Sequence, residues 1–220
     1  MELKIILTGA TGMVGEGVLL ECLEHPDVNE VLMINRRPIN LKHPKLKECI
    51  VPDFFYIEEF KDQLKGYDAC FFCAGISSAG MGEQEYTRIT YETTMHFANV
   101  LAGINPTIIF NFVSGAHTDS SEKGRIMWAR VKGKTENALM RLPFKRVYNF
   151  RPGFMKPTPG QKNIKGYYKV IGSFYPFLLM VFPNNVSTMK EVGLSMINSV
   201  RKGYSKQVLE IKDIKVLAKG

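Results

Sequence analysis

The sequence predicts an α/β fold, in which helices cover both faces of a mostly parallel sheet. Short apolar runs alternate along the chain with helical segments that are long enough to serve as crossover connections. The central runs, Tyr67–Cys73 and Thr107–Val113, are continuously apolar, which is typical of parallel strands covered on both faces. We expect residues 1–220 to form one domain, because 220 residues with 45% hydrophobic content suit a single core.

The expected elements follow one another in a regular order. Strands are expected at Leu3–Leu7, Val31–Ile34, Cys49–Val51, Tyr67–Cys73, Thr107–Val113 and Arg146–Phe150. Helices are expected at Met13–Leu23, around Glu58–Leu64, at Gln84–Ala102 and at Arg125–Arg141. The final part comprises an aromatic and apolar stretch, an amphipathic helix with Ser187 as its cap, and a late strand: Tyr167–Phe182, Ser187–Val200 and Gln207–Ile211. We expect residues from about 158 to 220 to form a small C-terminal lid over the carboxyl ends of the strands.

A glycine-rich loop joins the first expected strand to the first expected helix. It reads Thr8-Gly9-Ala10-Thr11-Gly12-Met13-Val14-Gly15. The first glycine allows a tight turn, the second lets backbone approach a pyrophosphate, and the third lets the helix pack against the strand. The phosphates would lie at the helix N-terminus. Because a strand precedes it and a helix follows it, we favour a Rossmann-type dinucleotide-binding loop over a plain strand–turn–helix. The expected cofactor contacts are Gly9, Thr11, Gly12, Met13, Val14 and Gly15.

The second expected strand ends in Asn35-Arg36-Arg37-Pro38, without a carboxylate. In NAD-binding folds an acidic residue about 20 residues past the glycines binds the ribose hydroxyls. A carboxylate repels a 2′-phosphate, whereas a guanidinium group binds it through paired hydrogen bonds. We therefore expect NADP(H) to be favoured over NAD(H), with Arg36 and Arg37 at the 2′-phosphate. The alternative is a solvated arginine pair at a turn.

Two further loops are expected to line the cofactor. Asp53 can bind the adenine amino group while the backbone amide of Phe54 meets a ring nitrogen; a plain turn aspartate is the alternative. The fourth expected strand ends in Cys73-Ala74-Gly75, where small side chains would let the nicotinamide half pass close to the backbone.

The charge pattern bears on partners and location. The net charge of +8 indicates a surface that favours anionic ligands. The basic residues are spread along the chain with no dense tract, so we expect no nucleic acid partner. We also expect no signal peptide and no stable membrane span, because the most apolar late stretch, Phe174–Pro183, is too short to cross a bilayer. The expected location is the cytoplasm.

The four cysteines include a Cys-x-x-Cys pair, Cys70 and Cys73, with the spacing of a redox pair or half a zinc site. Both fall in an expected strand, where residues three apart point to opposite faces. No second cysteine or histidine motif accompanies them. We expect core cysteines, a reducing compartment and no metal site.

Together these motifs resemble the short-chain dehydrogenase/reductase superfamily in its extended or atypical branch. The matching motifs are the glycine loop, Asp53-Phe54, Cys73-Ala74-Gly75, Val113-Ser114, Val131-Lys132-Gly133 and Arg151-Pro152-Gly153. They appear in the family's order over about the first 155 residues. The chain is also similar to NAD-dependent epimerase/dehydratase-like proteins and to the Tat-interacting oxidoreductase-like group.

The resemblance implies a catalytic serine and a Tyr-x-x-x-Lys motif. Ser114 matches the serine that orients the substrate, and Lys132 matches the lysine that lowers the pKa of the tyrosine and holds the nicotinamide ribose. The tyrosine position is Trp128, whose indole N–H donates a hydrogen bond but exchanges no proton near neutral pH. A proton could instead come from His117, from water or from another tyrosine, Tyr86 or Tyr91. The remaining alternative is that Trp128 and Lys132 are wrongly aligned with the Tyr-x-x-x-Lys motif.

Two functions stay open on the sequence. The first is an NADP(H)-binding oxidoreductase or epimerase-like enzyme that acts on a small, hydrophobic or carbonyl ligand. The second is a catalytically silent NADP(H)-binding sensor or interaction module, because Trp128 replaces the tyrosine. A homodimer or a protein partner is compatible with either function.

Overall fold

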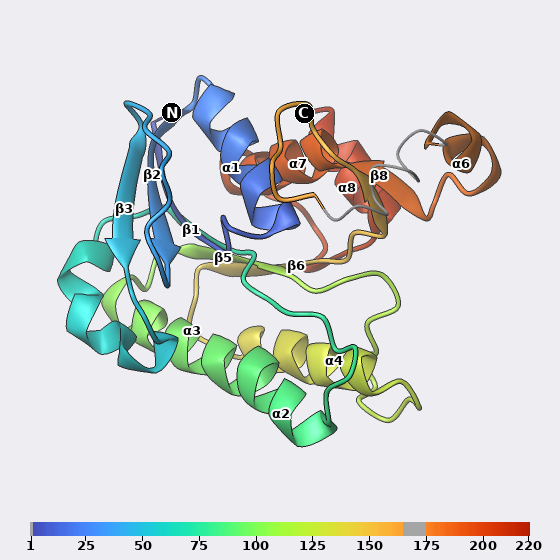
Figure 1. Cartoon of the computed structure of the whole chain (residues 1–220), viewed down its shortest axis with the longest axis horizontal. Coiled ribbons are helices and arrows are strands. Elements are labelled where there is room, and N and C mark those ends of the chain that lie inside the picture. The colour runs from blue at the N-terminus through green and yellow to red at the C-terminus, as the bar shows by residue number, and fades with distance from the viewer. Residues whose placement is uncertain (1, 165–174) are drawn as a thin grey trace.

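The computed structural model, which describes residues 2–164 and 175–220, contains a seven-stranded sheet (Figure 1). Its strand order is β3-β2-β1-β4-β5-β6-β9, and every neighbouring pair is parallel. The strands are β1 Leu3–Thr8, β2 Val28–Asn35, β3 Leu46–Ile50, β4 Ala69–Phe72, β5 Ile109–Val113, β6 Arg146–Phe150 and β9 Val208–Leu209. The first six follow the order of a doubly wound Rossmann sheet. The predicted fold class is confirmed.

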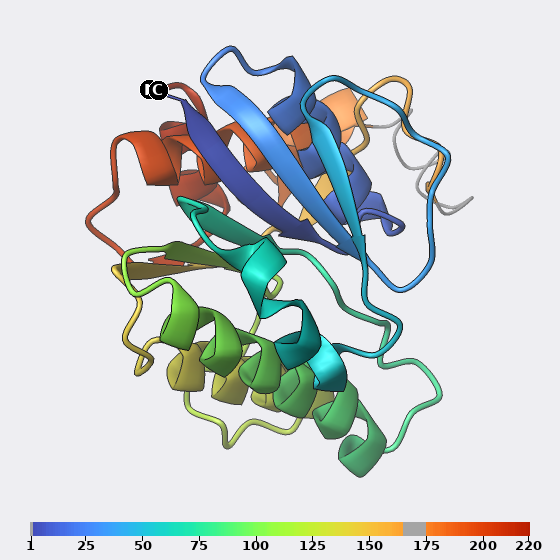
Figure 2. The ribbon, with the colours of Figure 1, turned by 90° about the vertical axis from the view of Figure 1, so that its left-hand side faces the viewer.

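Helices cover both faces of the sheet (Figures 1 and 2). One face carries α1 Met13–Glu24, α7 Met189–Arg201 and α8 Ile211–Ala218. The other carries the 3₁₀ helix η1 Phe54–Leu64, α2 Glu83–Thr87, the π-helical segment η2 Arg88–Glu92, α3 Thr93–Ile104 and α4 Met127–Leu139. A separate parallel pair joins β7 Phe154–Lys156 to β8 Val186–Thr188.

The alternation of side chains along each strand builds two cores, one on each face. On β1, Ile5 and Leu7 point toward α1 and α7, whereas Ile6 points toward α3. On β4, Cys70 lies in the α3 core while Cys73, just after the strand, packs against the α1 core. The two cysteines therefore lie on opposite faces, as predicted, and they do not form a pair.

Residues 186–220 of the C-terminal segment do not lie over the strand ends as a lid. Helix α7 packs on α1, and a Cβ at Gly193 would lie 2.6 Å from Cγ of Glu21. The short β9 extends the sheet beyond β6, so residues 186–220 complete the sheet and one of its helical layers. Helix α7 begins one residue later than expected: Thr188, not Ser187, accepts a hydrogen bond from the amide of Glu191 in a capping box. Ser187 lies in β8 and is buried.

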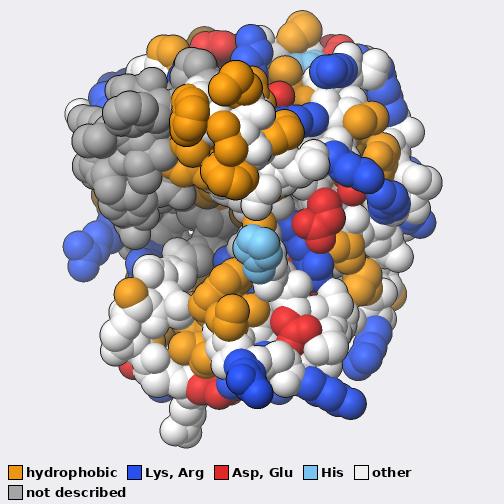
Figure 3. All heavy atoms as spheres, turned by 90° about the vertical axis from the view of Figure 1, so that its right-hand side faces the viewer, with side chains coloured by type: hydrophobic (Ala, Val, Ile, Leu, Met, Phe, Trp, Pro, Cys, Tyr) orange, Lys and Arg blue, Asp and Glu red, His pale blue; other side chains and the backbone are white. Residues whose placement is uncertain are grey.

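The aromatic stretch Tyr167–Phe182 is described in part, because residues 165–174 lie outside the described range. Helix α6, Tyr175–Val181, stands at one end of the molecule (Figure 1). Its side chains are largely not core residues, since Phe177, Met180 and the following Phe182 are 59%, 75% and 53% exposed. Hydrophobic side chains gather on the face of the molecule where α6 lies (Figure 3).

Candidate functional site

The glycine loop between β1 and α1 is tightly packed against the end of β4. Gly9 has a φ of +76°, and a Cβ there would lie 2.6 Å from the backbone nitrogen of Ala74. A Cβ on Gly15 would lie 2.1 Å from the carbonyl oxygen of Gly9. Gly12 is the N-cap of α1 and provides no side-chain hydrogen bond. The first amides of α1 are therefore left for an external anion, at the positive end of the helix dipole.

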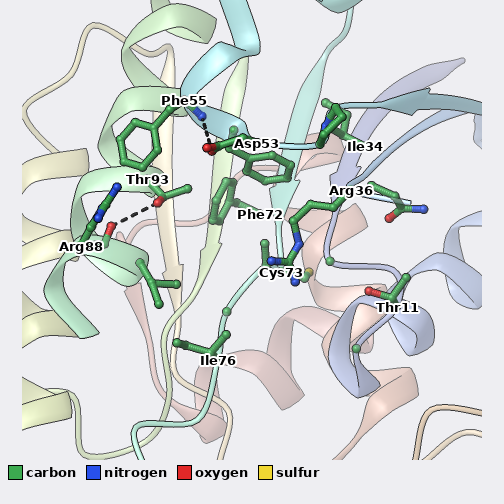
Figure 4. A pocket seen from close by; sticks show the side chains of 18 residues that line it. Thr11, Ile34, Arg36, Asp53, Phe55, Phe72, Cys73, Ile76, Arg88 and Thr93 are labelled. Carbon is green, nitrogen blue, oxygen red and sulfur yellow. Dashed lines mark hydrogen bonds between the residues drawn. The ribbon is translucent and has the colours of Figure 1, made fainter. Parts of the chain in front are cut away.

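A pocket of about 590 Å³ opens beside this loop (Figure 4). It lies at the carboxyl ends of β1, β2 and β4, where the strand order reverses and open α/β sheets bind their ligands. Its lining residues include nine of the predicted cofactor contacts: Gly9, Thr11, Gly12, Arg36, Asp53, Phe54, Cys73, Ala74 and Gly75.

Five predicted contacts lie elsewhere, and one of them, Lys132, lines a second pocket. Arg37 is exposed and does not line the pocket, and neither Met13 nor Gly15 lines it. Val14 also lines the second pocket. The carboxylate of Asp53 accepts a hydrogen bond from the backbone amide of Phe55 at 3.0 Å and so caps η1, as the turn-aspartate alternative anticipates.

The wall of the pocket opposite the glycine loop is formed by residues that no sequence motif predicts. This wall comprises Phe55 from η1, Arg88 and Ile89 from the π-helical segment, and Thr93 from α3 (Figure 4). The Thr93 hydroxyl donates to the carbonyl oxygen of Arg88 at 3.1 Å. A π-turn presents side chains at a spacing that the ordinary helical period does not anticipate, and no glycine or proline marks this one.

The second pocket, of about 290 Å³, shares Cys73–Ile76 with the first, so the two adjoin. Its lining residues come from α1, from the ends of β4, β5 and β6, from α4 and from β7: Val14, Cys73, Ala74, Gly75, Ile76, Val113, Ser114, Gly115, Lys132, Pro152, Gly153 and Met155. Predicted Ser114 and Lys132 are brought together here.

Lys132 is the ionisable group in the second pocket that titrates nearest to neutral pH. Its ammonium group donates to the main-chain carbonyl oxygen of Ser114. Burial lowers the pKa of Lys132 to about 8, although the carboxylate of Glu136 acts in the opposite direction. Burial also raises the pKa of Cys73 to about 12, so that its thiol stays protonated and unreactive.

The hydroxyl of Ser114 points to the protein interior. It donates to the carboxylate of Glu136 and lies 3.1 Å from the carbonyl oxygen of Phe150. Glu136 is one helical turn beyond Lys132 on α4, and its side chain is fully buried. The hydroxyl is therefore already engaged on the side away from a ligand.

Trp128 and the candidate proton donors His117, Tyr86 and Tyr91 do not line either pocket. Trp128 lies beside the rim of the second pocket, where a Cβ on Gly115 would be 4.0 Å from its Cζ3. His117 is exposed, with a φ of +66°. Tyr86 is buried, and the Tyr91 ring packs against Lys134 with the ammonium nitrogen 4.5 Å from its centroid. Among the described residues, no tyrosine or histidine lines either pocket.

The parallel sheet with its glycine loop and its crevice between β1 and β4 defines a Rossmann-type protein of the short-chain dehydrogenase/reductase class. The chain belongs to the NAD dependent epimerase/dehydratase family, whose sequence model matches residues 5–118.

Two relatives illustrate the similarity. Protein HTATIP2 of Rattus norvegicus is 27% identical over 154 residues, which cover 69% of this chain and 62% of that protein. Protein fmp52-1, mitochondrial, of Aspergillus terreus is 30% identical over 163 residues, covering 70% of this chain and 68% of that protein. The chain thus spans less than two thirds of HTATIP2. These matches confirm the predicted resemblance to atypical members of the superfamily and to the Tat-interacting group.

Solved structures share the fold at low sequence identity. Uronate dehydrogenase from Agrobacterium tumefaciens superposes with a TM-score of 0.67 at 14% identity, covering 94% of this chain and 76% of that one. The Bordetella bronchiseptica enzyme WbmF, solved in complex with NAD+, gives a TM-score of 0.64 at 15% identity, with coverages of 99% and 76%. Within residues 2–164 and 175–220, no helix is both long and apolar enough to cross a bilayer.

Proposed function

We propose that this protein binds NADP(H) across the two adjoining pockets, as an oxidoreductase-like member of its family. The observation that carries the proposal is the glycine loop, which packs against Cys73 and Ala74 and leaves the N-terminus of α1 open beside the larger pocket. The WbmF structure was solved with NAD+, which supports a nicotinamide dinucleotide as the ligand class.

The residues fit such a ligand. The loop residues Gly9–Gly15 would hold the pyrophosphate, Asp53 and Phe54 the adenine, and Arg36 with Arg37 the 2′-phosphate. Cys73–Gly75 would lie along the nicotinamide half, and a Cβ on Gly75 would meet no atom within 4 Å. Lys132 would hold the nicotinamide ribose. The bound cofactor would supply hydride exchange, and the chain would supply binding, orientation and exclusion of water.

The NADP(H) preference depends on Arg36, which lines the pocket, more than on Arg37, which does not. We expect Arg36→Asp to weaken NADPH binding at least about tenfold relative to NADH, because a charge-assisted contact is lost and a repulsion gained. Arg37→Asp makes the same change of charge and serves as the matched control, with a smaller effect. The ratio of dissociation constants, measured by nucleotide fluorescence, tests this. An unchanged ratio in Arg36→Asp would contradict the NADP(H) assignment.

Turnover is a separate question, because Trp128 takes the place of the tyrosine. For an oxidoreductase, we propose that Lys132 carries the proton or holds it at the substrate oxygen, with Ser114 and His117 as the weaker candidates. The alternative is a catalytically silent NADP(H) sensor or interaction module. It is favoured by the indole at position 128 and by the engaged hydroxyl of Ser114.

Two variants separate these functions. An oxidoreductase should oxidise NADPH when it is given an aldehyde or ketone from a panel of carbonyl substrates. In Lys132→Ala the rate of this oxidation should fall at least about 100-fold. A silent module should bind NADPH without turnover, and its affinity should change less than about twofold in Trp128→Tyr. Stopped-flow absorbance at the NADPH band measures the rate of NADPH oxidation. A fluorescence titration measures the affinity for NADPH. Failure of the wild type to bind NADPH would reject both.

The remaining parts of the proposal concern context. We propose one NAD(P)-binding domain over residues 1–220, a small hydrophobic or carbonyl ligand, a location in the cytoplasm, and assembly as a homodimer or with a protein partner. Light scattering at several protein concentrations tests the dimer, and imaging of the tagged full chain tests the location against the mitochondrial name of the Aspergillus terreus relative.

A further inference from the structure

A buried polar network lies directly behind the second pocket. Glu136 on α4 and Arg151 after β6 form a forked ion pair, with Nε to Oε1 at 3.0 Å and Nη2 to Oε2 at 2.5 Å. The exposed fractions of the two side chains are 0% for Glu136 and 10% for Arg151. An ion pair this deep costs desolvation free energy and is poor evidence of stabilisation by itself. We therefore ask which neighbouring groups this ion pair holds in place.

The pair is linked to both predicted active-site residues. Oε1 of Glu136 accepts the hydroxyl of Ser114, and the main-chain carbonyl of Ser114 accepts the ammonium group of Lys132. Because Lys132 and Glu136 are four residues apart on α4, they lie on one face of that helix. The end of β5, the helix α4 and the end of β6 are thus joined at one point of the pocket wall.

We propose that Glu136 is a positioning residue, which together with Arg151 fixes the Ser114 hydroxyl and the Lys132 ammonium group at the wall of the second pocket. The proposal rests on the proposed function, because it gives Lys132 its place beside the cofactor. It assigns Ser114 a supporting part: the main-chain carbonyl orients Lys132, and the hydroxyl is held by Glu136 away from the ligand.

The surrounding charges fit this arrangement. Arg151 also contacts Glu210, ahead of α8, at 3.1 Å and the hydroxyl of Ser120 at 2.5 Å, so its guanidinium group is satisfied from three elements. Asp119 in the neighbouring loop accepts from Ser121 and from the amide of Gly124 and takes no part in the pair. Glu136 is therefore the anion that acts on Lys132, and it favours the charged ammonium form.

The test is the titration of Lys132 in the ligand-free protein. With ¹³Cε-labelled lysine, NMR gives the midpoint of each lysine, and Lys132→Met identifies the signal of Lys132. In Glu136→Gln, which keeps hydrogen-bonding atoms and shape but removes the charge, we expect this midpoint to fall by about one pH unit or more, because a cation loses its anion. A folded Glu136→Gln variant with an unchanged midpoint would show a merely structural role and overturn the proposal.

If Glu136→Gln does not fold, Ser114→Ala provides a second test. Because Lys132 bonds to the main chain of residue 114, this variant should leave the titration midpoint of Lys132 within about 0.3 pH unit of wild type, which is a factor of about two in the proton dissociation constant. A fall of about one pH unit or more in this variant would show that the hydroxyl itself holds Lys132 and would contradict the proposal. Absence of NADPH binding in the wild type would reject the proposed function alone, since the titration uses no ligand.

Discussion

Replacing Gly9 with alanine is expected to destabilise the fold and abolish most nucleotide binding. The residue has a φ of +76°, which L side chains rarely adopt, and its Cβ would lie 2.6 Å from backbone atoms of both Cys73 and Ala74. Neither strand can yield, because Ala74 also donates its amide to the hydroxyl of Thr8 at 3.2 Å. Strained backbone and overpacking each cost about 1–3 kcal/mol, so we expect a loss of about 2–5 kcal/mol in the free energy of unfolding.

Urea unfolding measures this loss, and a fluorescence titration should show at least about tenfold weaker NADPH binding in the folded fraction. The matched control is Gly103→Ala on α3, where a Cβ would meet nothing within 4 Å. That variant should gain about 0.5–1 kcal/mol from better helix propensity. Similar stability changes in the two variants would show that the contact between the loop and β4 carries no strain.

The succession of strands and helices along the chain could be predicted because apolar runs and glycines act locally. Strand β4 is buried on both faces, and the continuous apolar run Tyr67–Cys73 predicts such burial directly. The sixth strand, Arg146–Phe150, falls where the sequence places it. The glycine loop likewise follows from backbone sterics at Gly9, a constraint that no other residue type meets.

Other features depend on tertiary contacts that a periodicity does not encode. The small size of Gly193 is explained by its contact with Glu21 on α1, which joins α7 to the sheet's helical layer rather than to a lid. The π-turn at Arg88–Glu92 shifts the helix phase beside the pocket and adds Arg88 to its wall. The N-cap of α7 is Thr188 and not Ser187, although serine and threonine are both favoured at an N-cap. The choice depends on strand β8, which buries Ser187.

Only part of the candidate site could be predicted, because its local motifs are visible in the sequence and its tertiary contacts are not. The adjacent Arg36 and Arg37 look equivalent in sequence, but only Arg36 lies on the pocket side of the turn after β2. The four-residue spacing on α4 places Trp128 and Lys132 on one face, as the resemblance implies. The engagement of the Ser114 hydroxyl by Glu136 required the structure, since it depends on a partner 22 residues away.

Removing Arg151 is expected to destabilise the protein by about 3–5 kcal/mol, because Glu136 would remain buried without its cation. The Ser114 hydroxyl supplies one hydrogen bond and cannot replace the two that Arg151 donates to the carboxylate. Unfolding of Arg151→Met in urea measures the loss, and the double variant Glu136→Leu/Arg151→Met should recover most of it, since apolar replacement of a whole buried pair is often neutral. Arg130→Met is the control, because its pair with Glu83 is far more exposed, at 24% and 52%, and should contribute about 0–1 kcal/mol. This variant also loses the hydrogen bond from Arg130 to the carbonyl oxygen of Gly124, which adds about 1 kcal/mol. If the double variant is as stable as wild type yet its Lys132 titrates at lower pH, the pair is retained for the geometry of the second pocket and not for the stability of the fold. A double variant that is no more stable than Arg151→Met would show instead that the network is needed for folding.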